Sequence, residues 1–128
     1  MPALVLQLVA GDFAVCRLPP AAPVPAWAGS AIFSSVTRTA DELSVICPAA
    51  AVPAGIKAER DWRLLQVAGP LDFGAVGVLA SLTAPLAQAG ISLLAVATFD
   101  TDYVLVRAAR LEDALRALEA AGHRVPRR

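Results

Sequence analysis

The chain has 128 residues, of which 57% are hydrophobic and 17% are charged, so it can bury a core and its composition excludes a disordered chain. Eleven basic and eleven acidic side chains cancel to a formal net charge of zero, which leaves no overall field to attract nucleic acid or an anionic membrane. No apolar run reaches the ~20 residues of a membrane-spanning helix, and the first residues lack the basic start of a signal peptide. We therefore expect a cytoplasmic protein of one domain or two very small ones, with no nucleic-acid or membrane partner.

Strand-like runs dominate the first part of the chain. They span residues 4–9, 13–18, 31–37 and 43–47. The turn pair Gly11-Asp12 separates the first two runs, so we predict that these two form a hairpin. Thr39 to Glu42 matches a helix capping box, but β-branched residues follow it. We therefore expect one turn of helix at most, followed by the strand. The loop at 48–57, rich in alanine and proline, predicts a division into residues 1–57 and 58–128.

The second part of the chain alternates between strands and helices. Residues 62–68 are strand-like, and Asp72 is a good helix N-cap shortly after them. Apolar residues then recur at helical spacing until Gly90; they are Ala75, Leu79, Leu82 and Leu86. Because proline costs ~3 kcal/mol inside a helix, Pro85 predicts a bend or an early end near Thr83.

Two further strands and a second helix complete the pattern. Residues 91–98 and 103–106 predict an antiparallel pair around a turn at 99–102. One helical face then carries Leu111, Ala114, Leu115 and Leu118. Gly122 stands where a C′ glycine belongs, and Val125 can close a short last strand. The order β-α-β-β-α-β predicts an α+β, ferredoxin-like fold with helices on one face of an antiparallel sheet.

The loop before the first helix is a candidate anion site. In GPLDFG, residues 69–74, a strand leads into a helix N-terminus, where free N–H groups favour a carboxylate. On this interpretation the donors are the amides of Phe73, Gly74 and Ala75. The alternative is that Asp72 caps its own helix and nothing binds.

The turn FDTD is a candidate cation site. Asp100 or Asp102 can accept hydrogen bonds from a ligand ammonium, while the helix N-terminus holds the ligand's carboxylate. A free amino acid carries both an ammonium and a carboxylate, so a site with a negative and a positive pole suits it. The alternative is an Asx-type turn, in which an aspartate bonds a backbone N–H two residues on.

Catalytic and cofactor motifs are missing from the sequence. His123 is the only histidine, and no serine or cysteine stands in a GxSxG pattern. The glycines at 69, 74 and 77 match neither nucleotide-binding motif. Cys16 and Cys47 lie in apolar runs, so buried thiols are expected rather than a disulfide or a zinc site. We expect no catalytic residue, no cofactor and no metal.

Several motifs resemble those of a known family. The stretch from Trp62 to His123, with GPLDF, SLTAPLA and TFDTDYVLV, resembles the C-terminal ACT unit of small bacterial ACT-domain proteins. It is also similar to units of the cytosolic CASTOR-type arginine sensors. The earlier stretches DFAVCRLP and TADELSVICP look like the N-terminal half of the same family.

The resemblance implies a strand-rich, reduced ACT-like half at residues 1–57 and an ACT domain at residues 58–128. It implies a homodimer, because the sensors carry more ACT units than 128 residues can hold, and a free amino acid bound at an interface between units. By match to the sensors, the ligand-binding positions are Leu71, Asp72, Phe73, Gly74, Ser92, Leu93, Thr98, Phe99 and Asp102.

Functions from three classes stay open at this point. The first is a non-catalytic regulatory protein of ACT type that binds an amino acid and changes its interface packing. The second is a ligand-free module that assembles through an exposed sheet edge. The third is a small enzyme on a ferredoxin-like scaffold, which the fold by itself does not exclude.

Overall fold

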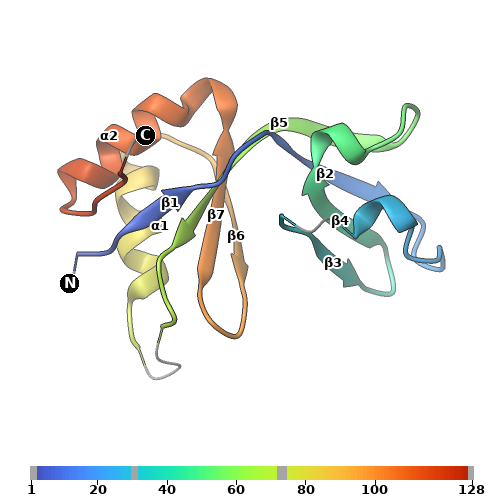
Figure 1. The fold of residues 1–128 in the computed structure, drawn as a ribbon, viewed down its shortest axis with the longest axis horizontal. Helices are drawn as coiled ribbons and strands as arrows, with labels where there is room; N and C mark the ends of the chain where they lie inside the picture. Colours follow the sequence, from blue (N-terminus) through green and yellow to red (C-terminus); the bar gives the residue numbers. More distant parts are fainter. Residues whose placement is uncertain (1–2, 30–31, 72–74, 127–128) are drawn as a thin grey trace. The chain divides into compact units, whose positions relative to one another are not determined.

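A computed structural model describes residues 3–29, 32–71 and 75–126 (Figure 1). These residues form two compact units, which are described separately below. The strand-rich unit comprises residues 11–62, and the helix-bearing unit comprises residues 1–10 together with 63–128. The first ten residues thus join the C-terminal unit, and the predicted division at residues 57 and 58 stays a prediction.

The strand-rich unit is a small antiparallel sheet. Strand β4 (Leu43–Pro48) pairs with β2 (Phe13–Leu18) on one side and with β3 (Ser35–Arg38) on the other. The first part of β5 (Lys57–Val67) pairs with the opposite edge of β2. The short 3-10 helices η1 (Ala26–Ala28) and η2 (Ala49–Ala51) lie in its loops. Its core contains Ala14, Cys16, Ala28, Leu43, Val45, Cys47 and Val52.

The two cysteines confirm the prediction of buried free thiols. Both are unpaired and buried, and the register Cys16↔Val45 and Ala14↔Cys47 makes them diagonal neighbours on adjacent strands. Burial raises the pKa of both thiols, and that of Cys47 reaches about 11. At neutral pH both therefore stay protonated and act as small apolar side chains.

The helix-bearing unit carries the predicted α+β fold. The second part of β5 pairs with β1 (Leu6–Leu8), with Leu6 opposite Val67. On its other side β5 neighbours β7 (Asp102–Arg107), which pairs antiparallel with β6 (Leu93–Ala97). The expected last strand is reduced to one parallel bridge between Val5 and Arg124.

The predicted hairpin of residues 4–9 and 13–18 is wrong. The first run became β1 and pairs with β5, and the second became β2 and pairs with β4 and β5. A period of two in apolar residues identifies a strand but does not choose its partner. Since Leu6 is completely buried in the core of the helix-bearing unit, burial there decides the pairing.

Two helices cover one face of this sheet (Figure 1). They are α1 (Val78–Gln88) and α2 (Leu111–Ala120), with the 3-10 helix η3 (Ala108–Arg110) before α2. The face predicted for α2 is buried, and Gly122 has φ +99° after the helix, as expected for a C′ glycine. Their shared core with the sheet comprises Leu6, Leu65, Val67, Leu82, Leu86, Ile91, Val104, Val106, Leu111, Ala114, Leu115, Leu118 and Val125. None of the described helices is both long and apolar enough to span a membrane.

Helix α1 continues through Pro85, so the predicted early end near Thr83 is wrong, and the alternative of a bend stays a prediction. A proline has no N–H, so the carbonyl of Ser81, four residues earlier, loses its helical partner. The Nε2 of His123 lies 2.9 Å from that carbonyl oxygen, while its Nδ1 accepts the N–H of Leu4 at 3.1 Å. Because Nδ1 is an acceptor, Nε2 carries the proton and donates it to Ser81. The only histidine therefore replaces the missing helical bond.

Candidate functional site

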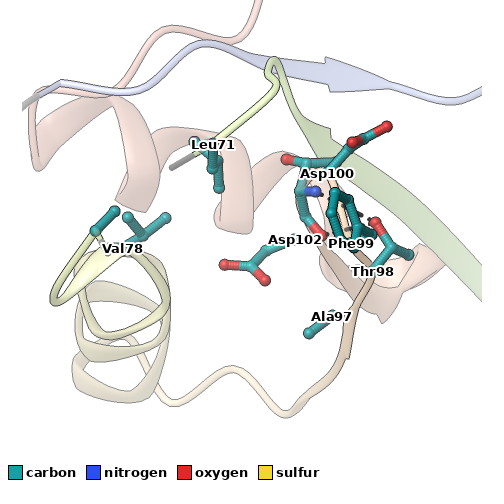
Figure 2. Close-up of a pocket in the computed structure, with 9 residues that line it drawn as sticks. Leu71, Val78, Ala97, Thr98, Phe99, Asp100 and Asp102 are labelled. Carbon is teal, nitrogen blue, oxygen red and sulfur yellow. Dashed lines mark hydrogen bonds between the residues drawn. The ribbon is translucent and has the colours of Figure 1, made fainter. Parts of the chain in front are cut away.

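A cavity of about 230 Å³ opens at one end of the helix-bearing unit (Figure 2). Its walls come from the loop between β5 and α1, from the start of α1, and from the turn between β6 and β7. It is smaller than the ~300–1,000 Å³ of sites for drug-sized ligands, so it suits a small metabolite. The lining residues are Leu71, Ala75, Val78, Ala97, Thr98, Phe99, Asp100, Thr101 and Asp102.

One backbone hydrogen bond and one side-chain hydrogen bond hold the end of β5 and its following loop to the turn between β6 and β7. The N–H of Leu71 donates to the carbonyl of Asp100 at 2.7 Å, and the hydroxyl of Thr101 donates to the carbonyl of Val67 at 2.6 Å. A Cβ at Gly69 would lie 3.0 Å from the nitrogen of Leu71 in the same loop, so a larger residue would require this loop to shift. The structure thus brings together the two segments that the sequence marked as anion and cation sites.

Threonines close the turn between β6 and β7, and the aspartates do not. The N–H of Thr98 donates to the carbonyl of Thr101 at 2.8 Å, and the N–H of Thr101 donates to the Thr98 hydroxyl at 3.2 Å. The described part of the chain offers no hydrogen-bond partner to the carboxylate of Asp100 or Asp102. The Asx-type alternative is therefore not the one that forms, and both carboxylates are available to a ligand.

The two carboxylates point in different directions (Figure 2). Asp102, the first residue of β7, is half-buried, and its side chain points into the cavity between Val78 and Ala97. Asp100, at the tip of the turn, is exposed and points away from the cavity. In a regular strand, two residues that are two positions apart would point to the same face. Asp100 and Asp102 point differently because Asp100 lies in the turn and only Asp102 belongs to β7.

The helix N-terminus lies further along the chain than predicted. Gly77 is the N-cap, with φ 78°, and α1 begins at Val78. The first N–H groups without helical partners are therefore those of Val78, Leu79 and Ala80, since the N–H of Ser81 already donates to the carbonyl of Gly77. The predicted role of the amide at Ala75 as a helical donor is corrected accordingly. Val78, the first residue of α1, lines the cavity, so the start of the helix borders the same space.

The other predicted positions fall into two groups. Asp72, Phe73 and Gly74 lie outside the described residues, so their predicted ligand contacts stay predictions. Ser92 is exposed before β6, and Leu93 is half-buried against the core at the end of β6 far from Ala97. Neither of these two lines the cavity.

Some lining residues were missed by the sequence-based reasoning. These are Val78, Ala97 and Thr101, whereas Ala75 was predicted as an amide donor and does line the cavity. A helix start placed after Asp72 hid the role of Val78, although a glycine in Val76-Gly77-Val78 is a signal for a left-handed residue. Thr101 was visible as a turn residue, but its buried bond to Val67 joins residues 34 positions apart, which no local pattern indicates.

The cavity has acidic and apolar walls. Among the described lining residues the charged ones are both aspartates. Among the described residues, no three histidine, cysteine, aspartate or glutamate side chains form a group that could hold a metal ion. The arrangement offers a carboxylate for a cationic group and backbone amides for an anionic one.

Comparisons with known proteins agree with this architecture. A family model of the ACT domain matches residues 57–120, and a second model, described as an N-terminal domain, matches residues 11–55. No match was found among curated proteins.

Several solved structures are similar. Protein Atu0741 from Agrobacterium tumefaciens is 35% identical, with a TM-score of 0.94 over 98% of this chain and 94% of that one. A Vibrio cholerae protein of unknown function, described as a possible transport protein, is 23% identical, with a TM-score of 0.71 over 93% and 90%. The regulatory subunit of aspartate kinase from Thermus thermophilus, in its ligand-free form, is 16% identical, with a TM-score of 0.64 over 91% and 97%. The last two likenesses show the fold alone.

The fold and the cavity together define a small α+β protein in which two hydrogen-bonded loops border a space of metabolite size. The chain belongs to the ACT-domain family, as the match to residues 57–120 and the 35% identity to a relative over nearly the whole chain show. This confirms the resemblance inferred from GPLDF, SLTAPLA and TFDTDYVLV, and the α+β fold that it implied.

Proposed function

We propose that this protein is a non-catalytic regulatory protein that binds a free α-amino acid in the cavity between the two loops. The observation that carries the proposal is the half-buried carboxylate of Asp102, which points into the cavity that Val78, the first residue of α1, also lines. A carboxylate and a helix N-terminus on the same small space provide opposite poles for a zwitterion.

The ligand ammonium binds Asp102 in this proposal. No described group competes for that carboxylate, and the absence of basic side chains from the described cavity lining leaves the acidic potential uncompensated. The ligand carboxylate accepts hydrogen bonds from the free N–H groups at the start of α1, where the helix dipole adds to the attraction. The proposed contacts also include Leu71, Thr98, Phe99 and, from the family resemblance, Asp72, Phe73 and Gly74.

A homodimer completes the site in this proposal. Val76 is 90% exposed and Phe99 is 78% exposed, and these residues flank or belong to the cavity lining. Apolar side chains with this exposure favour burial against a second copy, which would also exclude water from the ligand. The fold seen in an aspartate kinase regulatory subunit supports a regulatory role by analogy.

The same exposed side chains favour a second candidate function, a ligand-free assembly module. In that case Val76 and Phe99 serve only to join copies, and the cavity stays empty. The candidates differ in whether any amino acid stabilises the folded state.

Thermal unfolding in the presence of each common amino acid tests the proposal. A ligand at a hundred times its dissociation constant adds about 2.7 kcal/mol, which raises the melting temperature by roughly 10 °C for a chain of this size. Asp102→Asn removes the shift, because the ligand ammonium loses its partner. Asp100→Asn is the matched control, since it removes the same charge from the same turn on a side chain that points away.

Flat melting temperatures for every amino acid would leave the assembly module as the function. An equal loss of the shift in both variants would mean that the net charge of the turn matters and that Asp102 makes no direct contact.

A further inference from the structure

The cavity between the two loops has apolar side chains around its inward-facing carboxylate. Asp102 points inward between Val78 and Ala97, whereas Asp100 points away from the cavity (Figure 2). If Asp102 holds the ligand ammonium, as in the proposed function, the described lining aims no second carboxylate at a cationic side chain of the ligand. The aliphatic residues of the described lining are Leu71, Ala75, Val78 and Ala97.

The two threonine hydroxyls of the lining have no proton left for a ligand. A hydroxyl has one proton to donate. The hydroxyl of Thr98 donates to the carbonyl of Thr101 at 3.0 Å, and the hydroxyl of Thr101 donates to the carbonyl of Val67 at 2.6 Å. The Thr98 oxygen also accepts the N–H of Thr101 at 3.2 Å. The described lining therefore offers no side-chain donor to a polar side chain of the ligand.

Such a space favours an aliphatic side chain of the ligand over a polar or charged one. A polar group that leaves water without a new partner loses its hydration, while each aliphatic carbon gains free energy when it leaves water. A cationic side chain would reach Asp100 only outside the cavity, where an exposed ion pair contributes little. An anionic side chain would be repelled by both aspartates.

The size of the cavity limits the length of that side chain. Its volume of about 230 Å³ lies below the ~300 Å³ at which sites for drug-sized ligands begin. The ammonium, the carboxylate and the α-carbon, which every free amino acid shares, take up part of this volume. The remaining space suits a branched aliphatic chain better than an aromatic ring or a long basic chain.

We propose that the cavity selects amino acids with a short aliphatic side chain, such as valine, leucine and isoleucine. This inference rests on the proposed function and deepens it, since that function leaves the side chain of the ligand open. The aliphatic chain packs on Leu71, Val78 and Ala97 while the ammonium binds Asp102. Val78 and Ala97, which lie on either side of the Asp102 carboxylate, determine the specificity.

Pairs of free amino acids with the same shape and different polarity are the probes. Valine and threonine differ by a methyl group in place of a hydroxyl, and leucine and asparagine are a second pair. We expect valine to bind the full chain at least about tenfold more tightly than threonine, because the hydroxyl of threonine leaves water without a donor to replace it. Leucine should exceed asparagine and lysine by a similar factor.

Isothermal titration calorimetry measures these affinities and gives a second readout. Burial of apolar surface makes the heat capacity change of binding negative. The heat capacity change should therefore be more negative for leucine than for alanine. Equal values for these two ligands would show that the side chain stays in water, which would overturn the proposal.

Two variants locate the side chain of the ligand. Val78→Thr keeps the shape of the lining and adds a hydroxyl, so the preference for valine over threonine should fall by at least about threefold. Val36→Thr is the matched control, because it makes the same change at an exposed position of β3 in the strand-rich unit. Ala97→Leu fills part of the cavity and should weaken leucine about tenfold more than alanine. Circular dichroism checks that each variant is folded.

The outcomes separate this inference from the proposed function. Tighter binding of threonine, asparagine or a basic amino acid than of every aliphatic one would overturn the inference and leave the proposed function in place. A preference for valine over threonine that Val78→Thr and Val36→Thr change equally would also overturn it, because the side chain would then lie elsewhere. If no amino acid binds, the proposed function fails and this inference fails with it. The comparison of ligand pairs needs no variant, so it gives an answer even if a variant does not fold.

Discussion

The two units close a strand pair with the same four-residue turn and put it to different uses. In Thr39-Ala-Asp-Glu42 and in Thr98-Phe-Asp-Thr101, the threonine N–H donates to the carbonyl of the fourth residue. The threonine hydroxyl accepts the N–H of the fourth residue at 3.2 Å in both. The sequences around the two turns do not form a repeat of useful length. The two turns are therefore similar in their hydrogen bonds and not in the sequences that flank them.

The turns differ in what bonds the carbonyl of the third residue. In the strand-rich unit the carbonyl of Asp41 accepts a hydrogen bond of 2.9 Å from the guanidinium of Arg17, a long side chain on β2. In the helix-bearing unit the carbonyl of Asp100 accepts the backbone N–H of Leu71. A backbone bond holds a second loop against the turn, and a cavity forms between them. The hydrogen bonds within each turn thus depend on nearby residues alone. The cavity, in contrast, forms only where a second loop packs against the turn.

The largest effects should come from the cores and show whether the units unfold together. Leu82→Ala in α1 and Leu43→Ala in β4 each remove a fully buried side chain, at a cost of about 2–5 kcal/mol. Each unit has its own cluster of buried side chains, so we expect hydrogen exchange to accelerate most in the unit that carries the change. Equal acceleration in both units would mean one cooperative unfolding unit.

Removing one threonine hydroxyl from each turn, that of Thr101 or that of Thr39, should have different effects in the two units. Thr101→Val keeps the shape but leaves the buried carbonyl of Val67 without its donor, which costs about 1–3 kcal/mol of unfolding free energy. Thr101→Val should also weaken the binding of any ligand in the neighbouring cavity. Thr39→Val, in the exposed turn of the strand-rich unit, should cost less because water can replace the hydroxyl. Urea unfolding of both variants measures the difference.

A double-mutant cycle tests the bond that replaces the missing helical one in α1. His123→Ala should cost about 1–3 kcal/mol, because the carbonyl of Ser81 and the N–H of Leu4 both lose a partner. Pro85→Ala supplies an N–H for Ser81, so the loss from His123→Ala should be smaller in that background. Additive effects would show that Ser81 does not depend on His123.

The smallest effect should be the response of the strand-rich unit to alkaline pH. Burial raises the pKa of Cys47 from an ordinary 9.0 to about 11, so folding favours the protonated thiol. The contribution of this protonated thiol to the free energy of unfolding is fully present below about pH 9 and is lost as the pH rises through 11. Between about pH 8 and pH 10.5, the unfolding free energy should fall by on the order of 1 kcal/mol more in the natural sequence than in Cys47→Ala.

The site was predictable in outline because its parts follow local rules. A strand that leads into a helix N-terminus and a turn rich in aspartate are visible in the sequence, and the structure brings Leu71, Asp100 and Asp102 to one cavity. The helix start was not predictable from Asp72, because the structure uses Gly77 as the N-cap although aspartate is the more favoured N-cap residue. The direction of each carboxylate depends on how the turn docks, which a pattern of residue types does not encode.

The sequence by itself determined which segments form most of the helices, strands and turns, but not the two ends of α1, because periodicity and turn chemistry act over a few residues. The buried face of α2 and the glycine at 122 are examples. The tertiary structure decided which strands pair, which loops meet and which helical carbonyl a distant histidine satisfies. The first strand pairs with β5 and not with its neighbour in the chain, because apolar burial rewards any partner that completes a core, and only the folded chain selects among them.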